Sequence, residues 1–348
     1  MAEILGSFSL ATNLLIFAAC ATGVWFAGAR LTYVADALAD RYKLAKSLMG
    51  LLVLSVATSL PEVATTLSAA TQQNKDLVLN NLFGGVALQT AILALADFWA
   101  RGAITNYPRK ANHALEAILL VVLLAITLII SLLGDPISFG FLGMGSCLVA
   151  VAYVGAIWLL RRYDDASDWL PIDMPESREK EFSRPLAVDV KTPNQALITQ
   201  ALLACVVILV LGVLLVNSAE TIAIQSGLGR GFIGVTLLAA ATSLPELTTS
   251  ITAVRMGAYT MAISNIFGSN LIMLVLVFPA DILYVSGPIL RDVGATVPLA
   301  ISFGILVTAV YLGGLIVRRK PRIGAFGLDS ILVLVIFLVS LWSYYLVR

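Results

Sequence analysis

The sequence predicts an all-α membrane protein with about ten transmembrane helices. Three observations lead to this class: the composition, the recurrence of long apolar runs, and an internal duplication. Of the 348 residues, 59% are hydrophobic and 12% are charged, which is about half the charged fraction of a typical soluble domain. Apolar runs of roughly 20 residues can cross the hydrocarbon core of a bilayer, where helices satisfy their own backbone hydrogen bonds.

The ten candidate spans fall into two sets of five. In the first half, residues 1–160, they cover about 11–38, 46–70, 77–99, 112–133 and 137–160. In the second half, residues 195–348, they cover about 196–223, 231–254, 258–284, 292–317 and 326–347. Between the halves, residues 161–194 are rich in Asp, Glu, Arg and Pro, which predicts a solvated linker.

The basic residues predict the orientation of these spans. Of the 22 Lys and Arg residues, most lie in the set of loops that includes the linker. The loops of the opposite side and the chain end carry four: Lys75, Arg230, Arg291 and Arg348. By the positive-inside rule, the 161–194 linker is cytoplasmic and both termini lie outside. The compact size favours a bacterial or archaeal plasma (inner) membrane, and nothing in the sequence indicates an oligomeric state.

Other features of the composition exclude some functions. A net charge of +1 gives no basic surface for nucleic acid. The three cysteines lie in apolar segments and match no metal or disulfide spacing. No basic segment precedes the first apolar run, so we expect a retained helix there, not a cleaved signal.

The internal duplication links residues 50–70 to residues 234–254, at an offset of 184. Ten of the 21 aligned positions are identical, including the unbroken run A-T-S-L-P-E at 57–62 and 241–246. The same offset aligns Asn81 with Asn265 and Asp97 with Asp281. Five spans per half is an odd number, so the second half must enter the membrane in the opposite direction. Inverted repeats of this kind are typical of secondary transporters, whose binding site lies at the midplane.

Each copy of the duplication places oxygen-bearing side chains beside a proline. Pro61 cannot donate a backbone hydrogen bond, so we expect the helix to break or kink near 58–60. The break exposes carbonyl oxygens beside the Thr58 and Ser59 hydroxyls and the Glu62 carboxylate. The inverted copy contributes the matching set Thr242, Ser243 and Glu246. Hard cations such as Ca²⁺ and Na⁺ prefer such all-oxygen sites, and two carboxylates would neutralise one divalent ion.

A structural alternative exists for each glutamate. The spacing Ser59-x-x-Glu62, repeated as Ser243-x-x-Glu246, is also that of a capping box, in which Glu only satisfies a helix N-terminus. A carboxylate at the membrane centre costs about 2.5–3.5 kcal/mol on insertion scales. A helix cap stabilises by only about 1 kcal/mol. Two copies of the motif therefore favour a functional site, in which capping and ion binding are compatible.

The helices after each motif carry further polar groups. Gln89 and Ser269 are candidate extra ligands, whereas Asn81, Asn265 and Asn270 are equally suited to hydrogen bonding between helices. A charged side chain near the end of a span costs little free energy, because it can reach the membrane surface. We therefore expect Asp36, Glu220, Asp97 and Asp281 to be interfacial residues that end helices, with some capacity to attract cations. His113 is expected to be solvated near a membrane boundary.

The duplicated A-T-S-L-P-E, each copy followed by an N-x-x-G helix, resembles the α-repeats of the Ca²⁺/cation antiporter superfamily, which includes the sodium/calcium exchangers. The resemblance implies exchange of Ca²⁺ against Na⁺ or H⁺ by alternating access. It also implies an ion site on Thr58, Ser59, Glu62, Thr242, Ser243, Glu246 and Ser269, with backbone carbonyls near Ser55 and Ala239. No cofactor is expected beyond the transported cations, and inorganic cations and the lipid bilayer are the expected partners.

The chain also departs from the family pattern. Gly85 and Val86 replace the Ser and Asn of the usual G-S-N, and Gln89 stands where a further Asn is usual. Met273 occupies a position where sodium/calcium exchangers often carry Asp, and a thioether is a poor ligand for Ca²⁺ or Na⁺. Fewer anionic oxygens should support fewer Na⁺ sites. The departures therefore leave open a two-proton exchange and an altered ion selectivity.

Three other functions are alternatives to a cation antiporter. An anion carrier is excluded because Glu62 and Glu246 would repel the anion at the half-helix N-termini. An intramembrane enzyme is excluded because the chain lacks a nucleophile with a base and an orienting third group. An exchanger-like sensor or scaffold without transport stays possible because some ligands are lost.

Overall fold

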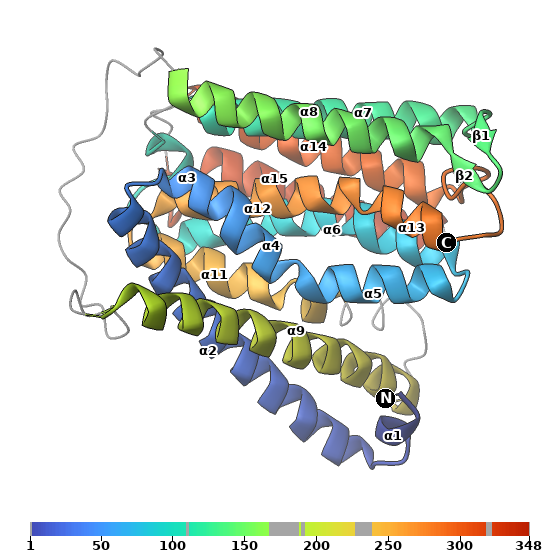
Figure 1. Cartoon of the computed structure of the whole chain (residues 1–348), viewed down its shortest axis with the longest axis horizontal. Helices are drawn as coiled ribbons and strands as arrows, with labels where there is room; N and C mark the ends of the chain where they lie inside the picture. The colour runs from blue at the N-terminus through green and yellow to red at the C-terminus, as the bar shows by residue number, and fades with distance from the viewer. Residues whose placement is uncertain are drawn as a thin grey trace.

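The computed structural model describes residues 2–108, 111–166, 188, 192–226, 239–317 and 322–347, and within them helices dominate (Figure 1). The first half contains α1 (Ala2–Gly6), α2 (Leu10–Tyr42), α3 (Lys46–Leu48), the π-helical η1 (Met49–Leu54), α4 (Ser55–Thr58), α5 (Leu60–Thr71), α6 (Lys75–Ala96), the short 3₁₀ turns η2 (Asp97–Trp99) and η3 (Ile104–Asn106), α7 (Asn112–Leu133) and α8 (Met144–Ala166). The second half contains α9 (Asn194–Gln225), α11 (Leu244–Arg255), α12 (Tyr259–Val275), α13 (Val277–Leu283), α14 (Thr296–Val317) and α15 (Leu328–Val347).

The expected membrane class is confirmed by these helices. Within the described residues, eight helices are long and apolar enough to cross a membrane. A ninth candidate is the bent segment 46–71, whose two parts meet at 48°. Of the predicted span 231–254, residues 231–238 lie outside the described part of the chain. The ten-helix count therefore stays a prediction.

Two antiparallel hairpins correct the predicted starts of two spans. The hairpin β1 (Ser138–Phe139) and β2 (Leu142–Gly143) delays the fifth helix to Met144, and β3 (Arg322–Ile323) with β4 (Phe326–Gly327) delays the last helix to Leu328. Each hairpin turns at a glycine of positive φ, Gly140 (67°) or Gly324 (65°), a conformation that glycine adopts without strain. The two hairpins are 184 residues apart, so the duplication extends to them.

The first long helices of the two halves, α2 and α9, pack against each other along one side of the bundle (Figure 1). Arg41 donates to Asn194 at one end of this pair (2.8 Å), and Asn13 donates to Gln225 at the other (2.9 Å). The C-terminal end of α2 thus lies beside the N-terminal end of α9, so the two helices are antiparallel. Oppositely inserted repeats require this arrangement.

The centre of the bundle is formed by α6 and α12. In the apolar windows of 75–99 and 259–283, 67% of residues are buried, against 17–44% in the other spans. Gly50 in η1 allows α12 to approach closely, because a Cβ at this position would lie 2.5 Å from the Met261 carbonyl oxygen. The segment that carries the first motif is thereby packed directly on the central helix of the second half.

This close approach predicts that Gly50→Ala destabilises the protein. The added methyl group meets backbone atoms of α12, which cannot move away without shifting that helix. Overpacking of this kind costs about 1–3 kcal/mol, so the melting temperature in detergent, followed by fluorescence, should fall. The matched control is Gly155→Ala in α8, where a Cβ meets nothing within 4 Å. Equal melting temperatures for the two variants would show that the approach does not constrain the fold.

Candidate cation site

Both copies of the duplicated motif interrupt a helix at the same residue. Ser59, between α4 and α5, has φ −79° and ψ 0°, and Ser243, before α11, has φ −89° and ψ 7°. The following Pro61 and Pro245 lie in the first turn of the next helix, where a missing N–H costs no hydrogen bond. The predicted break near 58–60 is confirmed, and the second copy repeats its geometry.

Each break places a glutamate in the first turn of the helix that follows it. Glu62 is the third residue of α5 and Glu246 the third residue of α11, with exposed fractions of 1% and 0%. The two breaks lie close together, because Ser59 donates to Glu246 Oε1 over 3.5 Å. Among the described residues, three of their four oxygens have no hydrogen-bond partner: both oxygens of Glu62 and Oε2 of Glu246. Two buried acids with unpartnered oxygens favour a positively charged occupant, either protons or a cation.

Hydroxyl groups surround the remaining oxygen of Glu246. Ser59 and Ser269 both donate to Oε1, over 3.5 and 3.4 Å, and Thr58 Oγ1 lies 3.4 Å from Ser269 Oγ. These side chains come from α4, the break, α11 and α12. Thus four of the sequence-predicted residues meet at one point, and they come from both halves of the chain.

The surroundings of Glu62 are less polar. The offset of 184 relates Ser269 to Gly85, which has no hydroxyl to donate. Thr242 donates instead to the carbonyl oxygen of Ala239 (3.0 Å), as Thr58 does to that of Ser55 (3.3 Å). Within the described residues, neither Thr242 nor Ser243 makes a hydrogen bond to Glu62, although both are buried.

Gln89 lies one helical turn beyond Gly85 on α6 and is fully buried. Neither its amide oxygen nor its amide nitrogen has a hydrogen-bond partner among the described residues. The Met273 side chain approaches Gly85, where a Cβ would lie 3.6 Å from the Met273 methyl carbon. Gln89 therefore has free polar atoms, but no hydrogen bond ties it to the two glutamates.

The capping-box alternative is wrong for both copies. Neither Ser59 nor Ser243 uses its side chain to cap the following helix. The unpartnered oxygens of Glu62 also exclude a reciprocal bond from this residue to a backbone amide.

The three asparagines after the motifs bind neighbouring helices: Asn81 donates to Thr66 (3.1 Å), Asn265 to Thr249 (3.0 Å) and Asn270 to Thr90 (3.4 Å). They connect neighbouring helices, as expected for packing contacts.

The four acids expected at the interfaces divide into two kinds. Glu220 is exposed, and Asp36 is buried and paired with Lys46 at 2.6 Å. Asp97 and Asp281 lie near helix ends, as expected, but they do not face solvent, because both are fully buried and accept backbone hydrogen bonds. Their partners are amides, which carry no sequence signature.

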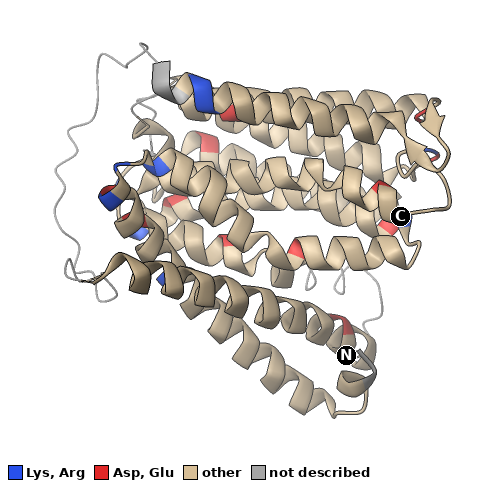
Figure 2. Cartoon of the chain, in the orientation of Figure 1, with Lys and Arg blue, Asp and Glu red and all other residues tan. Residues whose placement is uncertain are grey.

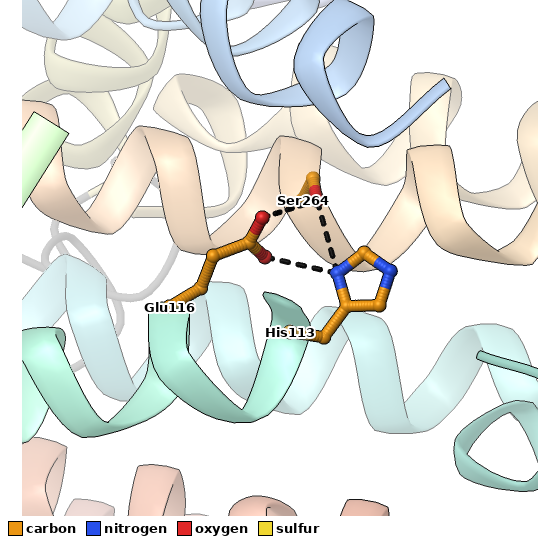
Figure 3. Close-up of polar contacts among 3 residues, drawn as sticks. All are labelled: His113, Glu116 and Ser264. Carbon is orange, nitrogen blue, oxygen red and sulfur yellow. Dashed lines mark hydrogen bonds and ion pairs between the residues drawn. The ribbon is translucent and has the colours of Figure 1, made fainter. Parts of the chain in front are cut away.

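The expectation that His113 is solvated is also wrong. His113 and Glu116 project from α7 toward Ser264 of α12, and all three are buried (Figure 3). His113 Nδ1 lies 3.0 Å from Glu116 Oε2 and 3.1 Å from Ser264 Oγ, which donates to Glu116 Oε1 over 2.7 Å. The His-x-x-Glu spacing at a helix start is the signal that could have indicated this pair. The cluster holds α7 against α12.

The chemistry of the candidate site is that of a hard-cation site. Its possible ligands are carboxylate, hydroxyl and carbonyl oxygens, which suit Ca²⁺ or Na⁺. No group of three or more His, Cys, Asp or Glu side chains suited to a metal occurs in the described residues. The site thus offers two negative charges, enough to neutralise one divalent ion or two protons.

Several known proteins are similar to this chain. A curated relative is the inner membrane protein YrbG of Escherichia coli, 26% identical over 326 residues that cover 90% of this chain and 91% of YrbG. CaxA of Alkalimonas amylolytica, whose name describes an antiporter, is 26% identical over 307 residues, or 86% of this chain and 89% of CaxA.

Solved structures and a family model extend the comparison. A structure of the sodium-calcium exchanger NCX_Mj soaked with 10 mM Na⁺ and 10 mM Sr²⁺ matches 96% of this chain and 99% of its own, with a TM-score of 0.72 and 16% identity. At this identity the likeness establishes the fold alone. The model of the family described as sodium/calcium exchanger protein matches residues 12–161 and again 197–346. Because these two matches cover most of the chain, the protein belongs to the sodium/calcium exchanger family of membrane cation antiporters.

Proposed function

We propose that this protein exchanges Ca²⁺ for H⁺ or Na⁺ by alternating access, with Glu62 and Glu246 as the two charged ligands of one site. The observation that carries the proposal is the pair of buried carboxyl groups with three unpartnered oxygens. An isolated ionised carboxylate in a buried position is strongly unfavourable. Such a pair gains stability whenever Ca²⁺ or two protons occupy it, and exchange between these occupants is antiport.

The hydroxyl groups around Glu246 suit a dehydrated cation. Ser59, Ser269 and Thr58 stand 3.4–3.5 Å from their neighbours in the cluster, well beyond the usual O–H···O distance of about 2.7–2.8 Å. Oxygens that share an ion at about 2.3–2.6 Å are spaced in a similar way. We therefore assign Thr58, Ser59, Ser269 and Glu246 to the stronger half of the site.

The weaker half supports a coupling scheme with few cations. Gly85 supplies no hydroxyl near Glu62, and Met273 supplies no carboxylate. Thr242, Ser243 and Gln89 are the remaining candidate ligands on this side. With only two anionic ligands, two protons balance one Ca²⁺ more readily than three Na⁺ do. We propose a two-proton cycle as the preferred coupling.

We place the protein in the inner (plasma) membrane with the 161–194 linker in the cytoplasm and both termini outside. Figure 2 supports this orientation: most of the Lys and Arg residues drawn lie at the end of the bundle where α8 finishes and α9 starts. The N- and C-termini lie at the other end (Figure 1). The name of the relative YrbG, an inner membrane protein, agrees with this membrane.

A second candidate is an exchanger-fold protein with altered selectivity or without transport. The observation that favours it is the loss of oxygen ligands at Gly85 and Met273. Direct Ca²⁺ binding separates a scaffold from a transporter, because a scaffold has no bound ion to lose when the glutamates are replaced. A panel of cations tests altered selectivity.

Replacing either glutamate should abolish exchange. In proteoliposomes, Glu62→Gln and Glu246→Gln should each lower Ca²⁺ uptake by at least about 100-fold, because one negative charge cannot neutralise a divalent ion in a buried site. Ca²⁺ binding to the purified protein, measured by calorimetry, should disappear in parallel. Uptake and binding near the unaltered level in either variant would contradict the two-glutamate site.

Two matched controls accompany this experiment. Glu116→Gln removes a buried carboxylate outside the site, and Glu220→Gln removes an exposed one. Both variants should bind and exchange Ca²⁺ with nearly unchanged apparent affinity. A loss in Glu116→Gln equal to that in the site variants would show that burial of the acid, and not its place in the site, decides the effect.

The coupling scheme predicts that membrane potential has little effect on exchange. Exchange of two H⁺ for one Ca²⁺ moves no net charge, whereas exchange of three Na⁺ moves one, which is about 2.3 kcal/mol per 100 mV. Ca²⁺ uptake should therefore respond to an imposed pH gradient but not to a potassium diffusion potential. Strong acceleration by potential, together with a requirement for Na⁺, would contradict the two-proton cycle.

A further inference from the structure

Two buried aspartates stand at the ends of the central helices. Asp97 follows α6 directly in η2, and Asp281 lies in α13, which continues α12. They are 184 residues apart, both have an exposed fraction of 0%, and they lie at opposite ends of the bundle. Neither belongs to the candidate cation site.

Each aspartate accepts hydrogen bonds from the other half of the chain. Asp97 Oδ2 accepts from the Gly327 amide (2.6 Å), and Asp281 Oδ2 accepts from the Gly143 amide (2.8 Å). Gly143 and Gly327 are themselves 184 residues apart and end the two hairpins. The first half therefore holds the hairpin of the second, and the second half holds the hairpin of the first.

Two further donors complete each contact. The Ile104 amide donates to Asp97 Oδ1 and the Ile289 amide donates to Asp281 Oδ1, both over 2.7 Å. Ser146, in the first turn of α8, donates to Asp281 Oδ2 over 2.5 Å. Ser330, its counterpart in α15, faces Asp97. We call the two sets the Asp97 clasp and the Asp281 clasp.

Glycine is required at the hairpin positions of both clasps. A Cβ at Gly327 would lie 2.8 Å from the Ala103 side chain and 3.3 Å from Asp97 Oδ2, and one at Gly143 would lie 3.1 Å from Pro288. The carboxylates thus reach the hairpin amides only because the side chains are absent. Each of the four carboxylate oxygens accepts a hydrogen bond from one backbone amide, so both acids are engaged in holding the chain.

We propose that Asp97 and Asp281 are positioning residues for the cation site. Each one fixes the C-terminal end of a helix that carries a candidate ligand: α6 carries Gln89, about 12 Å before Asp97, and α12 carries Ser269. Each also ties that helix to the last helix of the opposite half. The two clasps hold the ligand-bearing helices of both halves in register around Glu62 and Glu246.

The test combines local hydrogen exchange with cation affinity, and only the second readout depends on the proposed transport function. Asp97→Asn removes the negative charge and one of the two acceptor oxygens, which weakens the hydrogen bonds of both amides in its clasp. Deuterium uptake at Ile104 and Gly327 should rise by about tenfold, while Ile289 and Gly143 stay protected. Asp281→Asn should show the reverse pattern. The half-saturating cation concentration for exchange should change by about threefold or more in both variants.

Matched controls are Asp40→Asn and Asp292→Asn, which alter exposed acids and should leave both readouts unchanged. If an Asp variant fails to fold, Ser330→Ala and Ser146→Ala remove a single donor from the Asp97 and Asp281 clasps and should give the same pattern more weakly.

Unchanged deuterium uptake at Gly327 in Asp97→Asn, or at Gly143 in Asp281→Asn, would show that the aspartates do not hold the hairpins of the other half. Faster deuterium uptake at the clasp amides with unaltered cation affinity would overturn the positioning role and leave a purely structural one. If the unaltered protein exchanges no cation, the proposed function fails. The deuterium pattern still tests the clasps in that case. Cation binding measured by calorimetry then replaces transport as the second readout.

Discussion

The structure depends on the burial of two carboxyl groups, one from each half of the chain. A single carboxylate inside a membrane costs several kcal/mol, and two nearby carboxylates also repel each other. The protein does not offset this cost with basic side chains or with capping bonds to the backbone, because three of the four oxygens have no partner among the described residues. The proposed function supplies the compensation, because a cation or protons that enter and leave the site would neutralise the two carboxylates.

Residues of the first half contact residues of the second half throughout the structure. Ser59 of the first half donates to Glu246 of the second, and the Asp97 and Asp281 clasps hold hairpins across the same boundary. Gly50 allows η1 to pack on α12. Neither half can form the site alone, so the duplicated sequence acts as one structural unit. The differences at Gly85 and Met273 make the two halves chemically unequal within that unit.

Much of the site could be predicted because its determinants are local in sequence. A proline after Thr-Ser predicts a break, and a duplicated glutamate in an apolar run predicts a buried acid; both predictions are confirmed. Ser269 was identified from its own repeat and lies beside Glu246. The domain boundaries at 160 and 195, the inverted topology and the role of Gln89 stay predictions.

Features that depend on distant partners were not predictable. His113 is buried against Ser264, 151 residues away, and the His-x-x-Glu spacing indicates its pairing with Glu116 but not this contact. The amide donors to Asp97 and Asp281 were not predictable because backbone amides have no sequence pattern. The hairpins at 138–143 and 322–327 are too short for hydropathy to distinguish them from the helices that follow.

The most direct test of the account is the location of a bound divalent ion in crystals of this protein grown with Sr²⁺. Anomalous diffraction should give one strong peak within about 2.6 Å of carboxylate oxygens from both Glu62 and Glu246. A peak coordinated by only one of the two glutamates, or by neither in a protein that exchanges the ion, would contradict the shared two-carboxylate site.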